Sequence, residues 1–276
     1  MANSAAGGFA AQFLRSTAGE LFVLSYPGIP RDDLPPRALV VVPAFAEEMN
    51  KTRRQIALLG RALAPLNITT IVPDLYGTGD SAGDFGEATV SVWRDDLKTV
   101  FDWLTSTGFT QVSALGVRAG ALLLTDVLRH TDIQPDQLLL WQPVVSGKTL
   151  MSQFLRLKAA ASLTQETKGE GVRELRARLS QDESVEVAGY WLSPDLVAQF
   201  DALHLRDLDS VARLDWLQVQ DTEEPPPAVR TVMGALQERG IEVDFAVASG
   251  EPFWSTVEIS LAPALIDVTV TRLWGA

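Results

Sequence analysis

Short apolar runs alternate with amphipathic stretches along most of the chain. Continuous runs at Ala38–Val42 and Gln137–Trp141 are typical of strands that are buried on both faces of a sheet. Between them, apolar residues recur at helical spacing over 52–64 and 90–106. Strands that alternate with helices across short loops predict a mostly parallel, doubly wound sheet of the α/β class.

The same pattern places the remaining elements. Two β-prone segments at Phe9–Arg15 and Glu20–Tyr26, separated by Ser-Thr-Ala-Gly, predict an antiparallel hairpin at the N-terminus. A polar loop over 47–54 is expected to lead into the first helix. Further strands are expected at 68–72, just before Gly116, at 214–219 and at 242–248, and further helices at 121–128, 228–239 and 262–273.

The alternation of predicted strands and helices stops between residues 147 and 208. Helical patterns at 150–163, 172–179 and 195–205 surround a short apolar piece at 185–190. This stretch is too long for a simple crossover. We therefore expect one domain over residues 1–276 that carries an inserted helical cap at about 147–208, above the strand edge.

The segment Gly116-Val117-Arg118-Ala119-Gly120 lies between a predicted strand and a predicted helix. Glycines at the first and fifth places of such a turn match the nucleophile elbow G-x-S-x-G. Arg118 occupies the position that a hydrolase gives to serine. In a doubly wound sheet the loops at 43–54, 74–85, 116–120 and 142–147 should meet at this carboxyl edge.

Composition narrows the chemistry further. The formal net charge is −12, which disfavours nucleic acid and anionic membranes as partners. The chain has no Cys and 2 His, so thiolate and histidine-rich metal sites are excluded. No apolar run reaches the roughly 18 residues of a membrane span, and no signal peptide is recognised. We expect a cytoplasmic protein with no membrane span, metal or cofactor.

Several motifs together resemble one branch of the α/β-hydrolase superfamily. They are Pro43–Lys51 (PAFAEEMNK), Asp74–Gly77 (DLYG), Gly116–Gly120 (GVRAG), Leu140–Val144 (LWQPV) and Pro252–Trp254 (PFW). They are similar to the exosortase A system-associated hydrolase 2 family, over most of residues 9–270. The resemblance implies an α/β-hydrolase fold and a setting of exopolysaccharide synthesis with exosortase-mediated sorting. It establishes no reaction.

The ordinary triad is absent from this sequence. The order Ser…Asp/Glu…His requires a base after the last core strand, yet the loop at 250–254 has Glu251 and no histidine. Arg118 cannot attack a carbonyl. His130 and His204 lack the chain position of a base, so we expect structural or surface roles for both. Only the acid position is filled, by Asp221.

Two interpretations of Arg118 remain open. Its guanidinium can form an internal ion pair with Glu47, Glu48 or Glu251, because an unpaired buried charge is costly. Alternatively it can bind an anion, together with backbone N–H groups of Ala119 and Gly120 at a helix N-terminus.

For other polar residues near this edge, the sequence gives less indication of a functional role. Asp74 is expected to bond backbone amides, Ser81 to serve the turn, and Ser146 to cap a helix. A carboxylate pair of Glu251 with Asp221 or Glu47 is a further hypothesis for acid–base hydrolysis. The candidate ligand-binding residues are Arg118, Ala119, Ala44, Phe45, Glu47, Glu48, Asn50, Tyr76 and Gln142.

The sequence thus supports two functional hypotheses. The one favoured by the chemistry is a catalytically silent hydrolase-fold protein that binds an anionic or acyl small molecule, or a protein of the exosortase/exopolysaccharide system. The alternative is a hydrolase or acyl transferase with a non-standard site, acting on an ester, acyl or glycan-linked substrate. Whether the chain is an enzyme stays open at this point.

Overall fold

A computed structural model describes residues 8–162 and 170–275 of the chain. Within them one eight-stranded sheet has the order β1-β2-β4-β3-β5-β6-β9-β10, and its pairs are parallel except β1–β2 and β2–β4. The strands of this sheet are β1 (Ala10–Arg15), β2 (Glu20–Tyr26), β3 (Arg37–Val42), β4 (Ile68–Pro73), β5 (Gln111–Val117), β6 (Leu138–Trp141), β9 (Arg213–Val219) and β10 (Glu242–Ala248).

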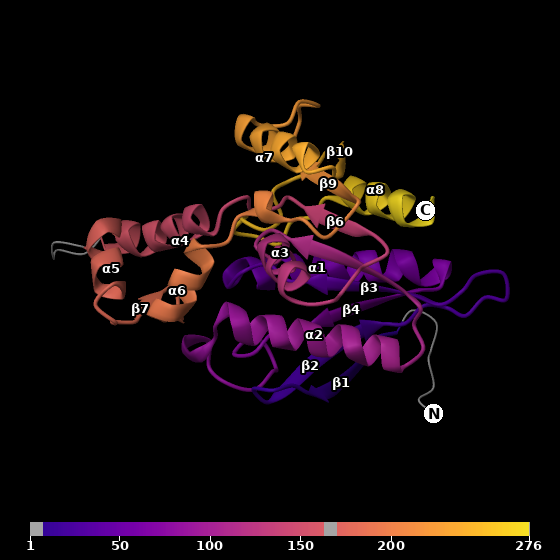
Figure 1. The fold of residues 1–276 in the computed structure, drawn as a ribbon, viewed down its shortest axis with the longest axis horizontal. Coiled ribbons are helices and arrows are strands. Elements are labelled where there is room, and N and C mark those ends of the chain that lie inside the picture. Colours follow the sequence, from indigo (N-terminus) through magenta and orange to yellow (C-terminus); the bar gives the residue numbers. More distant parts are fainter. Residues whose placement is uncertain (1–7, 163–169, 276) are drawn as a thin grey trace.

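Helices cover both faces of the sheet, as Figure 1 shows. One apolar cluster joins one face to α2, α3 and α7, and a second cluster joins the other face to α1 and α8. The sheet therefore has the expected doubly wound layers, with buried runs such as β6 at its centre. The bounds of these helices are α1 (Glu47–Leu63), α2 (Val90–Ser106), α3 (Gly120–His130), α7 (Pro227–Glu238) and α8 (Pro263–Trp274).

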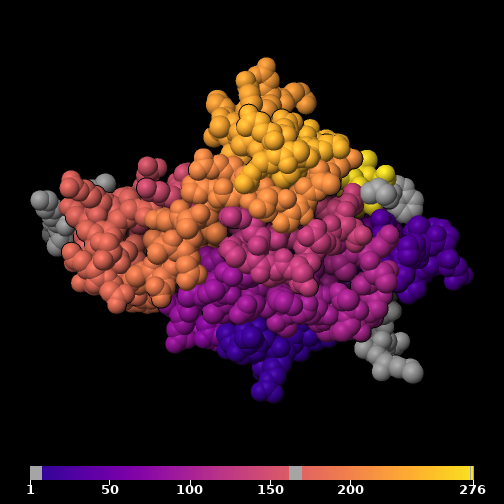
Figure 2. Space-filling view, viewed as in Figure 1, coloured from indigo at the N-terminus to yellow at the C-terminus, as the bar shows by residue number. Residues whose placement is uncertain are grey.

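Residues 147–162 and 170–208, which we call the insertion, lie at one end of the sheet (Figures 1 and 2). The apolar faces of its helices continue the cluster that holds α2 and α3. Its elements are α4 (Gly147–Ser162), α5 (Val172–Leu179), β7 (Val185–Val187), β8 (Tyr190–Leu192), α6 (Pro194–Asp201) and the 3₁₀ turn η3 (Leu205–Asp207). Smaller 3₁₀ turns are η1 (Ala64–Leu66) and η2 (Phe85–Glu87).

The mostly parallel sheet and the N-terminal antiparallel hairpin are confirmed. The predicted loop at 47–54 is wrong, because α1 already begins at Glu47. The apolar piece at 185–190 belongs to the antiparallel hairpin β7–β8. The last predicted helix of the insertion is shorter than expected and ends at Asp201, and the predicted end of α4 at Leu163 lies outside the described residues. No helix of the described residues is long and apolar enough to cross a membrane.

Candidate functional site

Three strands bring unusual backbone geometry to one edge of the sheet. Ala46 follows β3, Arg118 follows β5 and Gln142 follows β6, and their φ angles are 52°, 55° and 45°. Each costs on the order of 1–3 kcal/mol for a residue with a Cβ, and such strain clusters at functional sites. The expected convergence of these loops is therefore observed, and it coincides with locally strained backbone.

The elbow is closed by its two glycines. A Cβ on Gly116 would lie 2.7 Å from Cα of Ala121, and a Cβ on Gly120 would run into the carbonyl oxygen of Val42. Only residues without a side chain allow α3 to start this close to β3 and β5. The turn therefore keeps the shape of a nucleophile elbow and presents the residue at its third position, Arg118, above the strand edge.

Arg118 forms an internal ion pair with Glu48. Its Nε and Nη2 donate to the two carboxylate oxygens at 3.1 and 3.0 Å, and its Nη1 donates to the carbonyl oxygen of Gln142 at 3.0 Å. The guanidinium also lies 5.0 Å from the ring centroid of Trp254, a cation–π distance. The side chains of Arg118 and Glu48 are 16% and 24% exposed. Of the three carboxylates that the sequence offered as partners, Glu48 is the one that pairs.

The early start of α1 explains why Glu48 is the partner of Arg118. Glu47 and Glu48 form its first turn, where the N-terminal end of the helix dipole stabilises carboxylates. Successive helical residues point about 100° apart, so the two acids face different neighbours. Glu48 reaches the elbow, while the Glu47 carboxylate accepts from Nδ2 of Asn50 at 3.2 Å.

Asn50 also donates to the phenol oxygen of Tyr190 at 3.3 Å, so the start of α1 is tied to β8 of the insertion. Burial raises the pKa of the Tyr190 phenol, and the nearby Glu47 carboxylate raises it further. Tyr190 therefore stays protonated and able to hydrogen-bond. The polar residues Glu47 and Asn50 thus connect the insertion to α1.

The space beside the elbow is filled by aromatic side chains. A small apolar cavity there, lined by Phe45, Ala44 and Ala119 among others, has only about 10 Å³. That is the lower limit for a single water molecule. The ring of Phe45 packs 5.3 Å from Phe154 and 5.2 Å from Phe200, both from the insertion. A substrate acyl group has no room at this place in the described structure.

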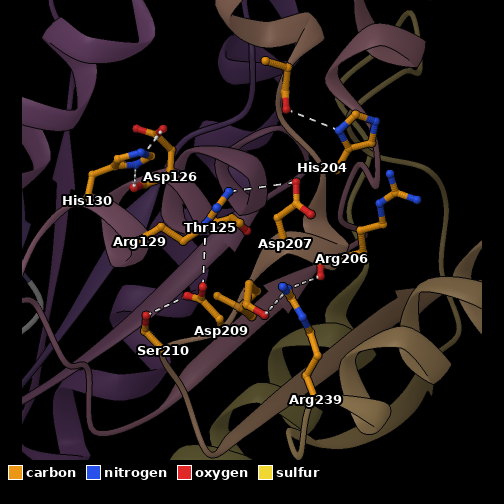
Figure 3. Close-up of polar contacts among 12 residues, drawn as sticks. Thr125, Asp126, Arg129, His130, His204, Arg206, Asp207, Asp209, Ser210 and Arg239 are labelled. Atoms are coloured by element: carbon orange, nitrogen blue, oxygen red, sulfur yellow. Dashed lines mark hydrogen bonds and ion pairs between the residues drawn. The ribbon is translucent and has the colours of Figure 1, made fainter.

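The two histidines of the sequence make their contacts elsewhere (Figure 3). Nδ1 of His130 lies 2.8 Å from the carbonyl oxygen and 3.2 Å from Oδ1 of Asp126. Since His130 ends α3, about 15 Å along the helix from the elbow, it cannot act as a base for position 118. Nδ1 of His204 faces the carbonyl oxygen of Ala202 at 3.3 Å.

The two candidate catalytic acids, Asp221 and Glu251, lie at the surface of the protein. Both residues are exposed, and in the described part of the chain neither carboxyl group shares a hydrogen bond with the other or with Glu47. The carboxylate pair of Glu251 with Asp221 or Glu47 therefore stays a hypothesis for acid–base hydrolysis. Within residues 8–162 and 170–275 there is also no group of three or more His, Asp or Glu side chains that could hold a metal ion.

The loop after β4 has a structural role. Asp74 accepts from the backbone N–H of Asp80 at 3.0 Å, as expected, and also pairs with Arg53 at 2.8 Å. Ser81 donates to the carbonyl oxygen of Asp74 and accepts from the backbone of Phe22 at 2.8 Å.

Tyr76 and Gln142 are also held by the surrounding structure. The Tyr76 hydroxyl donates to Glu87 at 3.0 Å, and Oε1 of Gln142 accepts from the backbone N–H of Val219 at 2.7 Å. Ser146 lies at the start of α4, where its Oγ accepts from the N–H of Thr149 at 3.4 Å.

A wider groove lies next to this site. It has a volume of about 250 Å³ and is bounded by the start of α1, by α4 and by the loop after β10. Glu48 and Trp254 separate it from Arg118, which does not line it. Lys51 and Trp254, which belong to this groove, were not among the predicted site residues. One signal for Lys51 and Trp254 was present in the sequence. They belong to the motifs at 43–51 and 252–254, which were expected to lie near the same edge of the sheet.

Solved structures share this architecture over nearly their whole length. Est1E from Butyrivibrio proteoclasticus aligns with a TM-score of 0.61 at 11% identity, over 96% of this chain and 98% of that one. Alpha/beta hydrolase domain-containing protein 10 from mouse aligns with a TM-score of 0.61 at 15% identity, over 96% and 97%. XC6422 from Xanthomonas campestris, an α/β serine hydrolase without a lid, aligns with a TM-score of 0.55 at 16% identity, over 96% and 94%.

The chain has an α/β-hydrolase fold. No protein-family model matches it, and neither does any curated protein sequence. At identities of 11–16%, these likenesses concern the fold, and the chemistry has to be argued from the residues at the elbow.

Proposed function

We propose that this chain is a catalytically silent protein on an α/β-hydrolase fold, which binds a ligand or a partner at the carboxyl edge of its sheet. The observation that carries the proposal is Arg118 at the elbow, held on both sides by Glu48 and the carbonyl oxygen of Gln142. A guanidinium stays protonated in proteins and has no lone pair with which to attack a carbonyl.

Two further observations support the absence of hydrolysis. Both histidines of the sequence are committed to other parts of the structure, so no imidazole base faces the elbow. The rings of Phe45 and Phe200 fill the space that an acyl substrate would need. In this proposal Arg118 supplies no nucleophile, no imidazole lies at the elbow to act as a base, and the cavity that the described residues leave there is too small for an acyl group.

A binding role is supported by the strain that remains. Ala46, Arg118 and Gln142 keep positive φ angles although no triad requires them, and strain of this kind persists where the site still has a task. Within the proposal, a phosphate or carboxylate of the ligand replaces Glu48 on Arg118, next to the N-terminal end of α3. The resemblance of its motifs to those of exosortase-associated hydrolases supports a role in exopolysaccharide synthesis with a partner from that system, and the proposal places this role in the cytoplasm.

The alternative is a hydrolase or acyl transferase with a non-standard site. The observation in its favour is that the elbow backbone is intact in a fold that it shares with Est1E, which has been solved with ferulic acid bound. A serine-directed fluorophosphonate probe and a panel of short-chain esters separate the two. We expect neither labelling nor turnover by the purified protein, and robust labelling or turnover would overturn the silent assignment.

The anion site has its own test. Titration of the protein with inorganic phosphate and with short acyl carboxylates should give weaker binding in Arg118→Ala than in the wild type. An affinity that is unchanged in Arg118→Ala would remove Arg118 from the binding site and leave its pair with Glu48 as a purely structural contact.

A further inference from the structure

The sheet has two outer edges, β1 and β10, and they differ in how they are protected against pairing with a further strand. Glu242 and Asp244 lie within the first three residues of β10. β1 has Arg15 as its one charged residue, at its last position, and it has no proline. Its six residues pair with β2 without a bulge, and in the described part of the chain no strand pairs with its other side. Charges, prolines and bulges are the usual protections of a free edge, so β1 is the unprotected one.

Exposed aromatic side chains accompany this free edge. Phe9, directly before β1, and Phe13 within it are 70% and 55% exposed. By the alternation of a strand, positions 9, 11 and 13 share one face, and Ala11 lies between the two rings. Phe13 packs against Phe22 of β2 with ring centroids 5.5 Å apart, whereas Leu14 on the opposite face packs against the cluster that holds α2. At the margin of the sheet (Figure 1), β1 thus combines free backbone hydrogen-bonding groups with a strip of aromatic rings.

We propose that β1 pairs with β1 of a second copy of this chain, antiparallel and about a two-fold axis at Ala11. In this register Phe9 of each copy faces Phe13 of the other, and the two small Ala11 side chains meet on the axis. Two aromatic cross-strand pairs then lie on either side of a small centre. One strand therefore supplies both halves of a complementary surface, as a two-fold interface requires.

A second copy is the occupant because β1 is complementary to itself, and because the assembly closes. Each copy has one unprotected edge, while the acids of β10 disfavour strand addition at the other end of the sheet. The dimer therefore uses up the free edge of both copies and does not grow into a fibre.

The area of this interface predicts a weak and reversible dimer. Phe9 and Phe13 together present about 250 Å² per copy, if a whole phenylalanine presents about 200 Å². Five paired residues of an edge add roughly 170 Å², at about 3.4 Å by 10 Å each. The two copies together then bury roughly 800 Å², below the 1,200–2,000 Å² of stable complexes, so we expect a dissociation constant of about 10–100 μM.

The charge of the whole chain gives the dimer a characteristic response to salt. Each copy has a formal net charge of −12, so the two repel each other at long range. Salt screens this repulsion and leaves the apolar and backbone contacts of β1 in place. Dimerisation should therefore strengthen by several-fold between about 0.05 and 0.5 M NaCl, whereas a contact held by ion pairs would weaken.

Sedimentation velocity of the full chain over about 5–500 μM tests the proposal. We expect the mass to rise with concentration from 30.0 kDa toward twice that value. Ala11→Lys and Ala11→Glu each place two like charges opposite each other on the axis, and each should weaken dimerisation at least tenfold. An equimolar mixture of the two variants should dimerise again, because opposite charges then meet on the axis. Gln237→Lys, exposed at the end of α7, is the matched control and should dimerise like the wild type.

Several results would overturn the proposal. A mass of 30.0 kDa at every concentration means that no second copy covers β1. Dimerisation that persists in both Ala11 variants, or that weakens with salt, assigns the contact to another surface. Variants that stay monomeric after mixing refute the axis at Ala11. Because Ala11 is exposed, its variants should unfold at the temperature of the wild type, and thermal unfolding checks that a lost dimer does not come from lost folding.

Discussion

The ion pair between Arg118 and Glu48 can be measured directly with a double-mutant cycle. Glu48→Gln removes the charge of the carboxylate and keeps its size, and Arg118→Met removes the guanidinium and keeps an unbranched side chain. The double variant has neither partner. The coupling free energy is the difference between the loss of stability in the double variant and the sum of the losses in the two single variants.

The expected magnitude follows from the geometry. Two charge-assisted hydrogen bonds of 3.0 and 3.1 Å join the pair, and each such bond contributes about 1.5–3 kcal/mol. Exposures of 16% and 24% leave part of both groups in water, which lowers the desolvation cost and the attraction together. We expect a coupling of about 2 kcal/mol, and a loss of roughly 2–3 kcal/mol in Glu48→Gln because Arg118 stays behind unpaired.

Urea unfolding, followed by tryptophan fluorescence and by circular dichroism, gives these free energies if the two signals coincide. In a thermal scan, about 2 kcal/mol corresponds to a decrease of Tm of roughly 5 °C in a protein of this size. Glu47→Gln is the control, since its carboxylate is exposed and bonds only Asn50 and Tyr190, and we expect a loss below about 0.5 kcal/mol. A coupling below about 0.5 kcal/mol would show that Arg118 is not held by Glu48 in solution.

Three further variants test other parts of the structure by the same unfolding measurements. Gly120→Ala should cost roughly 3 kcal/mol, because its Cβ runs into the carbonyl of Val42, whereas Gly234→Ala in the open middle of α7 should gain up to about 1 kcal/mol. Phe45→Ala should cost about 3–5 kcal/mol and open the cavity beside the elbow, which a xenon-soaked crystal would reveal. Burial raises the pKa of the Asp96 carboxyl, so its contribution to stability is fully present below its ordinary pKa of 3.8 and decreases as the pH rises. The wild type should therefore lose stability relative to Asp96→Asn as the pH rises above the ordinary pKa of 3.8, and a constant difference would contradict this.

The sheet and its helices could be predicted because their signals are local. An apolar run such as Ala38–Val42 marks a central strand whatever lies far away, and α2 was predicted with the bounds that the structure has. The start of α1 was missed because Glu47 to Arg54 is polar and reads as a loop. The two acids of its first turn were the available sign of a helix N-terminus.

The partner of Arg118 could be narrowed to three carboxylates but not to one. Which of Glu47 and Glu48 faces the elbow depends on the phase of α1, and therefore on the exact residue at which it begins. The groove beside the elbow could not be predicted from the sequence, for a different reason. It exists only because α4 packs near the start of α1, and residues such as Lys51 and Leu157 are about a hundred positions apart in the chain.

The chain leaves and re-enters the body at nearly the same place around the insertion. Ser146 and His204 form an isolated β-bridge, and Gly147 lies so close to the carbonyl of Phe200 that no side chain would fit. A segment with adjoining ends can be exchanged without moving the strands on either side, provided that its replacement also covers Phe45 and the apolar faces of α2 and α3 on which the insertion packs. Evolution, or a protein engineer, can therefore graft a different recognition module at Ser146 and His204 while the elbow below keeps its backbone.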